Sequence, residues 1–326
     1  MSLAYPDDPK APTATAKTGA AESSADAPAP ESPPAEAPQI DGEAALQKLV
    51  AQIEEISTLP AVALRVIEVA SDPESGAQDL KQAMEADPAL CVRVLRCVNS
   101  AAFGLRESVE DLGRAVAYLG FNQIRDLAIT ATVSGLFRKP TKVGKYERAN
   151  LWRHLVAVGV AARMIATRTR TEGFEYAFLA GLLHDVGIVL FDQHAHEPFT
   201  KIMVTLNGEL DLPTAERQVI GWDHTQLGEA VARNWRLPEV ICATTRWHHD
   251  PSSYSGAHSN VVHTVAVANL ICSAKDLSSV GWNLLGLSRD SLAALKVDAN
   301  DLKIFADDLD AELDKNSYLF DLQANG

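Results

Sequence analysis

The stretch FLAGLLHDVGIVLFD, residues 178–192, places an adjacent His184–Asp185 pair inside an otherwise apolar run with helical spacing. Such a run has to be buried, and burying two titratable side chains costs free energy unless a partner compensates for it. A metal ion, a charged ligand or a tight hydrogen-bond network could each provide that compensation. The fold must therefore either bring partners to this pair or leave the pair at a solvated surface.

The composition limits the classes of protein to which the chain can belong. The 326 residues are 47% hydrophobic and 22% charged, as expected for a globular protein of one or two domains. No run approaches the roughly 18 apolar residues of a membrane helix, and the N-terminus lacks a secretory segment, so we expect no membrane association. The net charge of −14 argues against broad binding to nucleic acid. Because they form no CxxC pair, four cysteines are predicted to be reduced core residues of a cytoplasmic protein: Cys91, Cys97, Cys242 and Cys272.

The chain divides into four predicted regions. Residues 1–42 hold half of the sixteen prolines and almost no aromatic side chains, so they cannot bury enough apolar surface and are predicted to be a disordered tail. Residues 43–140 are predicted to be an N-terminal helical subdomain, and residues 141–275 a helical core that contains all nine histidines. Residues 276–326 form an acidic extension with apolar residues at helical steps, which either packs back on the bundle, as we expect, or pairs two chains into a homodimer.

Hydrophobic periodicity predicts helices almost throughout residues 43–315, and no stretch alternates convincingly as a strand would. Asp87 is a predicted N-cap followed by Pro88 at the first helical position, and Asp223 is a predicted cap before His224. The fold class is therefore all-α, a two-part helical bundle. In the second half, a basic turn is expected at 138–145 and helices at 146–169, 174–191, 212–220, 224–234, 238–248, 260–274 and 290–315.

The histidines of the second half point to chemistry, because histidine is the commonest metal ligand and the usual carrier of protons near neutral pH. Imidazoles and a carboxylate from several helices could converge inside a bundle. Such a set suits a first-row divalent metal, or a two-metal site that activates water against a phosphoester. The candidate ligands are His154, His184, Asp185, His224, His248 and His249.

Each candidate also has a structural interpretation. His154 could be a hydrogen-bonded core residue, and His224 could support a helix start beside Asp223. The His248–His249 pair could place positive charge at a helix C-terminus, where the macrodipole favours it. The remaining histidines are interpreted as surface residues: His194, His196, His258 and His263.

The GLLHDVG stretch resembles the signature of the HD superfamily, the all-α metal-dependent phosphohydrolases named for the HisAsp doublet. A more specific resemblance, over about residues 50–275, is to the HD-related output domain, HDOD. The stretches that carry it are STLPAVALRVIEVASDP, DPALCVRVLRCVNSAAFG, AVAYLG, LW, AFLAGLLHDVG and WRLPEVICATTRWHHDP. This resemblance implies a bacterial signalling module in which an N-terminal helical subdomain packs on a degenerate HD core that is usually not enzymatic.

The same resemblance assigns the metal ligands residue by residue. His154, His184 and Asp185 match the first three positions of the HD pattern, and Asn269 stands where the pattern has a late Asp. An amide there removes one negative charge and leaves a weaker oxygen ligand. The histidines at 224, 248 and 249 resemble those that the HD-GYP cyclic di-GMP phosphodiesterases add, but the GYP motif is missing, because the chain continues as DPSSYSGAHSN. The implied cofactor is a divalent metal, Fe, Mn or Zn, in a partly retained site.

Two functions follow from these motifs. The preferred hypothesis is a regulatory module of the HDOD type that is not catalytic and that acts through an unidentified signalling protein. Its support is the incomplete ligand set, the missing GYP segment and the long N-terminal segment. The alternative is a metal-dependent phosphohydrolase acting on a nucleotide or cyclic dinucleotide, because the remaining imidazoles and carboxylate could still hold a metal that acidifies a bound water.

Overall fold

The computed structural model describes residues 42–56, 61–72, 74–206, 208–281, 286 and 288–323, all within one compact unit, Ile40–Gly326. The predicted tail lies outside these residues except for Gly42, which begins the first helix. The described part contains sixteen α-helices, several single-turn 3-10 helices and one hairpin of two short strands. The predicted all-α class is confirmed. The hairpin, β1 (Lys142–Val143) and β2 (Tyr146–Glu147), occupies the place where a basic turn was predicted.

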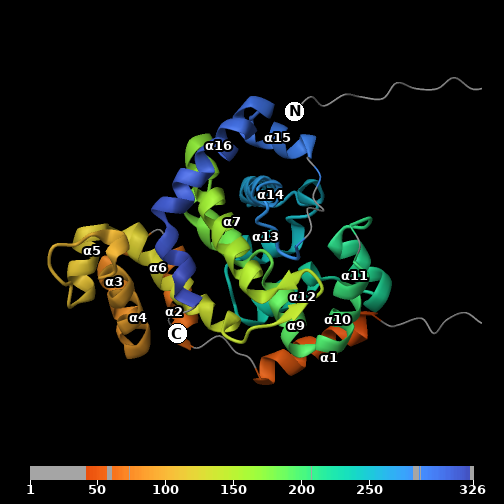
Figure 1. Cartoon of the computed structure of the whole chain (residues 1–326), viewed down its shortest axis with the longest axis horizontal. Helices are drawn as coiled ribbons and strands as arrows, with labels where there is room; N and C mark the ends of the chain where they lie inside the picture. The colour runs from red at the N-terminus through yellow and green to blue at the C-terminus, as the bar shows by residue number, and fades with distance from the viewer. Residues whose placement is uncertain are drawn as a thin grey trace, which may run out of the picture. The chain divides into compact units, whose positions relative to one another are not determined.

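The first helices are α1 (Gly42–Ile56), α2 (Ala61–Ser71), α3 (Ala77–Glu85), α4 (Pro88–Val98), α5 (Leu112–Leu119) and α6 (Phe121–Val133). Figure 1 shows α3, α4 and α5 grouped together, and α6 packs against α2, α4 and α5. The start of α4 is as predicted, because the Asp87 side chain accepts hydrogen bonds from the backbone of Ala89 and Leu90. Helix α1 comes first in the chain, but it packs on α9 and α12, two helices of the histidine-rich half.

The histidine-rich half contains α7 (Arg148–Thr169), α8 (Ala177–Leu183), α9 (Val186–His194), α10 (His196–Thr205), α11 (Leu212–Ile220), α12 (His224–Asn234), α13 (Glu239–Trp247) and α14 (Ser259–Ala274). Helices α11 and α12 have the bounds that the sequence predicted. The predicted helix at 174–191 is instead divided into α8 and α9 by the His184–Asp185 pair. Helix α7 packs on α8 and α14, and α12 packs on α9 and α13 (Figure 1).

The C-terminal extension packs back on the bundle, as expected. One helix was predicted at 290–315, but the chain forms α15 (Arg289–Leu295) and α16 (Ala299–Lys315). The two separate because Lys296 adopts a left-handed conformation and Asp298 caps the second helix. Helix α16 lies against α7 and buries Phe305 and Leu309.

One segment, Phe174–His194, is long and apolar enough to cross a membrane by length and composition alone, which corrects the expectation that no run approaches that size. It is 83% buried inside the protein and is divided by His184 and Asp185. Its apolar character is therefore explained by its position in the core.

A buried charge network joins three regions of the chain. The Asp126 carboxylate on α6 pairs with the guanidinium of Arg163 on α7 and with Arg125 Nε at 3.2 Å. The Arg163 guanidinium also donates to Asn316 Oδ1 at 2.9 Å, just after α16. Because the Asp126 side chain is only 1% exposed, its charge depends on these partners.

We expect R163M to lower the free energy of unfolding by about 3 kcal/mol, because it removes one of the two guanidinium partners of a buried carboxylate and leaves only Arg125. The matched control is R168M on the same helix, whose exposed pair with Asp308 should contribute less than about 1 kcal/mol. Urea denaturation measures both variants. Equal losses in the two variants would show that the buried network contributes no more to stability than the exposed pair.

Candidate metal centre

Glycines on both sides of the HisAsp pair let two neighbouring helices approach it closely. A Cβ atom at Gly181 would lie 2.8 Å from the Gly159 Cα of α7, and one at Gly187 would lie 1.9 Å from the His224 carbonyl oxygen at the start of α12. Neither distance is possible for a real Cβ, so both positions need glycine. The two glycines in GLLHDVG therefore allow α7 and α12, which carry His154 and His224, to contact the α8–α9 junction.

Asp185 is the N-cap of α9, yet its side chain makes no capping hydrogen bond. Aspartate at this position ordinarily accepts from the first backbone N–H groups of the helix, an interaction of about 1 kcal/mol. Other helices of the described part follow that rule, with side-chain caps from Asp87, Asp111, Asp211, Asp223 and Asp298. The Asp185 carboxylate is instead turned toward the histidines and is almost completely buried.

One oxygen of Asp185 faces the first pair of histidines. Its Oδ2 atom lies 3.3 Å from His184 Nε2 and 3.7 Å from His154 Nε2. The two Nε2 atoms are 3.3 Å apart. His154 and His184 are both fully buried, so three potential ligand atoms meet here without access to water.

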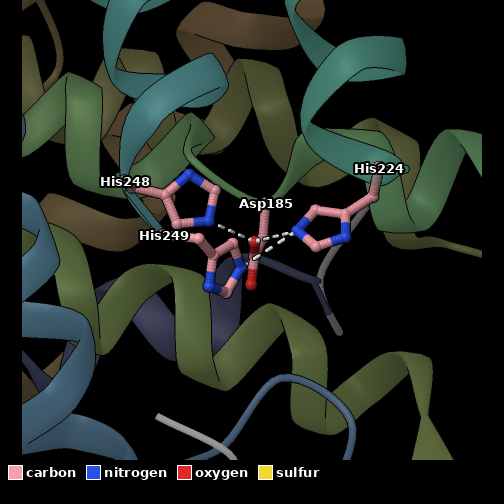
Figure 2. A group of neighbouring side chains, drawn as sticks. All are labelled: Asp185, His224, His248 and His249. Carbon is pink, nitrogen blue, oxygen red and sulfur yellow. Dashed lines mark hydrogen bonds and ion pairs between the residues drawn. The ribbon is translucent and has the colours of Figure 1, made fainter. Parts of the chain in front are cut away.

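The other oxygen faces the second set of histidines. The Asp185 Oδ1 atom lies 3.1 Å from His248 Nε2 and 3.3 Å from His224 Nε2. His249 joins this group, with its Nε2 atom 3.2 Å from that of His224. Figure 2 shows the three rings arranged around the carboxylate. All six residues predicted as metal ligands thus come together around one buried aspartate, and their ligand atoms form two groups that share it.

Hydrogen bonds donated by Nδ1 orient most of these rings. A carbonyl or carboxylate oxygen can only accept, so Nδ1 carries a proton and Nε2 is the ring atom turned toward Asp185. The acceptors are Leu277 O for His154 (2.5 Å), Gly181 O for His184 (2.7 Å), Thr244 O and Thr245 O for His248 (3.1 Å each), and Glu216 Oε2 for His224 (2.6 Å).

Burial favours the neutral form of several rings. It lowers the pKa of His154 to about 4, with a further contribution from His184. Burial also lowers the pKa of His248 and holds the pKa of His249 well below its ordinary value. Burial raises the pKa of Asp185, but the surrounding imidazoles outweigh that effect and hold it well below the usual range. Burial also lowers the pKa of His224, but the Glu216 and Asp185 carboxylates outweigh that effect and hold it well above its ordinary value. Metal ions require neutral imidazoles and ionised carboxylates, so a metal bound at His224 would have to displace its Nε2 proton.

Two buried atoms support the fit to a metal ion. Asp185 Oδ1 and His248 Nε2 are buried, face each other and have no hydrogen-bond partner among the described residues. Orphaned buried acceptors of this kind are costly unless something positive satisfies them. The cluster could therefore hold a metal ion, and imidazole nitrogen with carboxylate oxygen suits first-row divalent metals.

Asn269, placed at the late Asp position by resemblance, lies buried on α14. Its Oδ1 atom accepts from Ser273 Oγ at 3.4 Å. Together with His248 and His249 it lines a cavity of about 460 Å³. The amide therefore stands at the edge of the cluster, in a wall that it shares with two of the predicted ligands.

Sequence reasoning missed three residues beside the cluster. Glu216 on α11 is completely buried and accepts from His224, whereas Arg217 and Arg246 line the cavity. An acidic residue eight positions before a histidine resembles any solvated helix residue, so only the packing of α11 reveals it. The one weak indication of Glu216 in the sequence was its position in a short predicted helix just before the predicted Asp223 cap.

The other histidines require one correction. His263 was interpreted as a surface residue, but it is buried and its Nδ1 atom lies 3.0 Å from Ser291 Oγ of α15. The expectation failed because α15 covers this side of α14, which the sequence did not indicate. His196 is exposed, and His194 and His258 are partly exposed.

A comparison with protein families matches residues 56–251, more than half of the chain, to the HDOD domain. The chain therefore belongs to the HDOD family, as its motifs predicted. Among curated proteins, an uncharacterised protein of Treponema pallidum (strain Nichols) is 27% identical over 222 residues. That match covers 67% of this chain and 42% of the Treponema protein, so this chain spans less than half of the relative.

Solved structures share the fold. An HDOD domain protein of unknown function from Geobacter sulfurreducens is 25% identical, with a TM-score of 0.70 and coverage of 86% of this chain and 98% of that one. A Marinobacter aquaeolei protein whose name proposes signal transduction has a TM-score of 0.70 at 20% identity, covering 88% and 67%. A Shewanella amazonensis protein whose name proposes a phosphohydrolase has a TM-score of 0.65 at 22% identity, covering 84% and 98%. The last two likenesses concern the fold alone.

We expect G187A to separate α9 from α12 and to lower the free energy of unfolding by about 3 kcal/mol, because its Cβ would collide with a backbone atom. G135A is the control, since a Cβ there meets nothing within 4 Å. It should change stability by less than about 1 kcal/mol. Thermal and urea denaturation measure both, and an unchanged G187A variant would contradict the close approach.

Proposed function

We propose that this HDOD protein is a signal-transduction module whose buried cluster holds two divalent metal ions bridged by Asp185. The observation that carries the proposal is the position of that carboxylate, with one oxygen toward His154 and His184 and the other toward His224 and His248. Family membership supports the signalling role, and the name of the Marinobacter relative proposes the same for that protein.

The first ion would be held by His154, His184 and Asp185, and the second by the ligand group Asp185, His224, His248 and His249. Imidazole-rich sites of this kind suit Fe, Mn or Zn. When bound, such ions polarise phosphoryl oxygens and acidify water. The chain's own contribution is to fix the rings through Nδ1 and to exclude water around Asp185.

Three features favour regulation over catalysis. Asn269 replaces the late carboxylate of the HD pattern, and the GYP motif is absent from the sequence. The two cavity arginines are engaged within the protein, Arg217 with Asp223 and Arg246 with Thr225. We therefore propose that the centre stabilises the helical core and that the output passes to a signalling protein in the cytoplasm.

Metal content tests this proposal. We expect the purified protein to contain about two divalent ions per chain. D185N alters the ligand shared by both groups and should lose most of both ions, whereas H184A removes a ligand of the first group and should lose about one. H196A alters an exposed histidine outside the cluster and should keep the wild-type content. Elemental analysis measures all four proteins. Chelation of the wild type should also lower its stability, by about 2.7 kcal/mol if free metal had been at 100 times its Kd.

A second candidate function is phosphoester hydrolysis, favoured by the cavity. The cavity of about 460 Å³ has His248 and His249 in its wall together with Arg217 and Arg246. A phosphate-bearing ligand placed there would meet the second ligand group and two guanidinium groups. The name of the Shewanella relative proposes such an activity for that protein.

We expect no turnover of cyclic di-GMP or of a simple phosphodiester by protein loaded with Fe, Mn or Zn beyond that of D185N treated in the same way. The physical reason is the neutral amide at Asn269, which leaves the centre one anionic ligand short. Product analysis by chromatography measures the rate. Robust turnover that D185N and H184A abolish would replace the regulatory proposal by the hydrolase.

A further inference from the structure

We infer that Glu216 is the positioning residue of the second metal ion, because it fixes His224 as an Nε2 ligand. This inference rests on the proposed function and extends it to a residue outside the ligand groups. Glu216 lies on α11 and is fully buried, and its Oε2 atom accepts the His224 Nδ1 proton at 2.6 Å. The ring is therefore held with Nε2 directed to Asp185, 3.3 Å away.

The same carboxylate oxygen also fixes the backbone of the ligand. Glu216 Oε2 accepts from the His224 backbone N–H at 2.9 Å, so one atom holds both the first backbone N–H group of α12 and its first side chain. Ligand rings that are held at two points lose less freedom when a metal binds, and carboxylates behind metal-bound histidines strengthen the ligand.

The next residue of α11 strengthens this arrangement. The Arg217 guanidinium pairs with Asp223, and Asp223 Oδ1 accepts from the backbone of Thr225 at 3.0 Å and of Gln226 at 3.1 Å. Two consecutive residues of α11 thus hold two consecutive residues at the start of α12. Only the Glu216–His224 pair contains a proposed metal ligand. Mutation can therefore separate the effect of Glu216 on metal binding from the effect of Arg217 on the start of α12.

Glu216 differs in charge from the groups that accept hydrogen bonds from the other histidine rings. His154, His184 and His248 donate from Nδ1 to neutral backbone carbonyls, whereas His224 donates to a carboxylate. The second carboxylate oxygen, Oε1, is buried without a hydrogen-bond partner among the residues described. A glutamate whose only task was to support the helix start would leave that oxygen orphaned without benefit. A charged anchor that strengthens a metal ligand explains why a carboxylate stands here.

The inference distinguishes the two halves of the centre. Glu216 contacts His224, a member of the second ligand group, and forms no hydrogen bond or ion pair with His154 or His184. Its removal should therefore weaken the second ion and leave the first in place. Changes to such outer partners commonly reduce metal affinity by about 10- to 100-fold.

The experiment is a titration of metal-free protein with Mn²⁺, followed by electron paramagnetic resonance, which separates a coupled pair of ions from a single one. We expect E216A to bind the second Mn²⁺ about 100-fold more weakly and E216Q about 10-fold more weakly, with the first Mn²⁺ unchanged in both. E216Q keeps the size and the acceptor oxygen, so it reports on charge even where E216A does not fold.

The control is D192N, which alters another fully buried carboxylate of the core. Asp192 accepts from Tyr146 and Arg148 and lies outside both ligand groups, so its loss should lower stability without changing Mn²⁺ affinity. Wild-type affinity for the second Mn²⁺ in E216Q and E216A would overturn the inference while leaving the metal centre intact. A wild-type protein that binds no Mn²⁺ would overturn both the inference and the proposed function.

Discussion

The structure depends on one buried carboxylate that does not cap its own helix. Asp185 begins α9, yet its side chain turns inward to imidazoles from α7, α8, α12 and α13. The forgone cap and the burial of a charge are both unfavourable, and they are tolerated only where a stronger set of interactions replaces them. Three features bring the imidazoles to Asp185 in place of the cap: the helix break at 184–185, the flanking glycines and the orientation of α12.

Local signals explain how much of this fold could be predicted. The bounds of α11 and α12 were predicted from hydrophobic periodicity and the Asp223 cap. In the structure Asp211, Gly221 and Asp223 cap these helices, and such caps act within a few residues. Residue types and family resemblance identified six candidate ligands, and the structure brings all six together. The division at His184–Asp185 was missed, because an apolar run with helical spacing gives no sign of a break when the interruption depends on tertiary contacts.

The sequence could not reveal which residues contact and orient the candidate ligands. Glu216 faces inward only because α11 packs on the start of α12, and His263 is buried only because α15 covers α14. Both facts depend on how one helix packs on the next, which the residue pattern within each helix does not indicate. A single sequence states the chemistry of a site more readily than the scaffold that orients it, because orientation is set by packing.

The placement of α1 has a mechanical consequence. A Cβ on Gly42 would lie 2.8 Å from the carbonyl oxygen of Gly221, in the short connection that precedes His224, and α1 then runs along α9 and α12. The first described helix therefore packs beside the segment from Glu216 to His224, which holds one imidazole toward the carboxylate. A displacement of α1 would reach that segment directly, without first passing through α2 to α6.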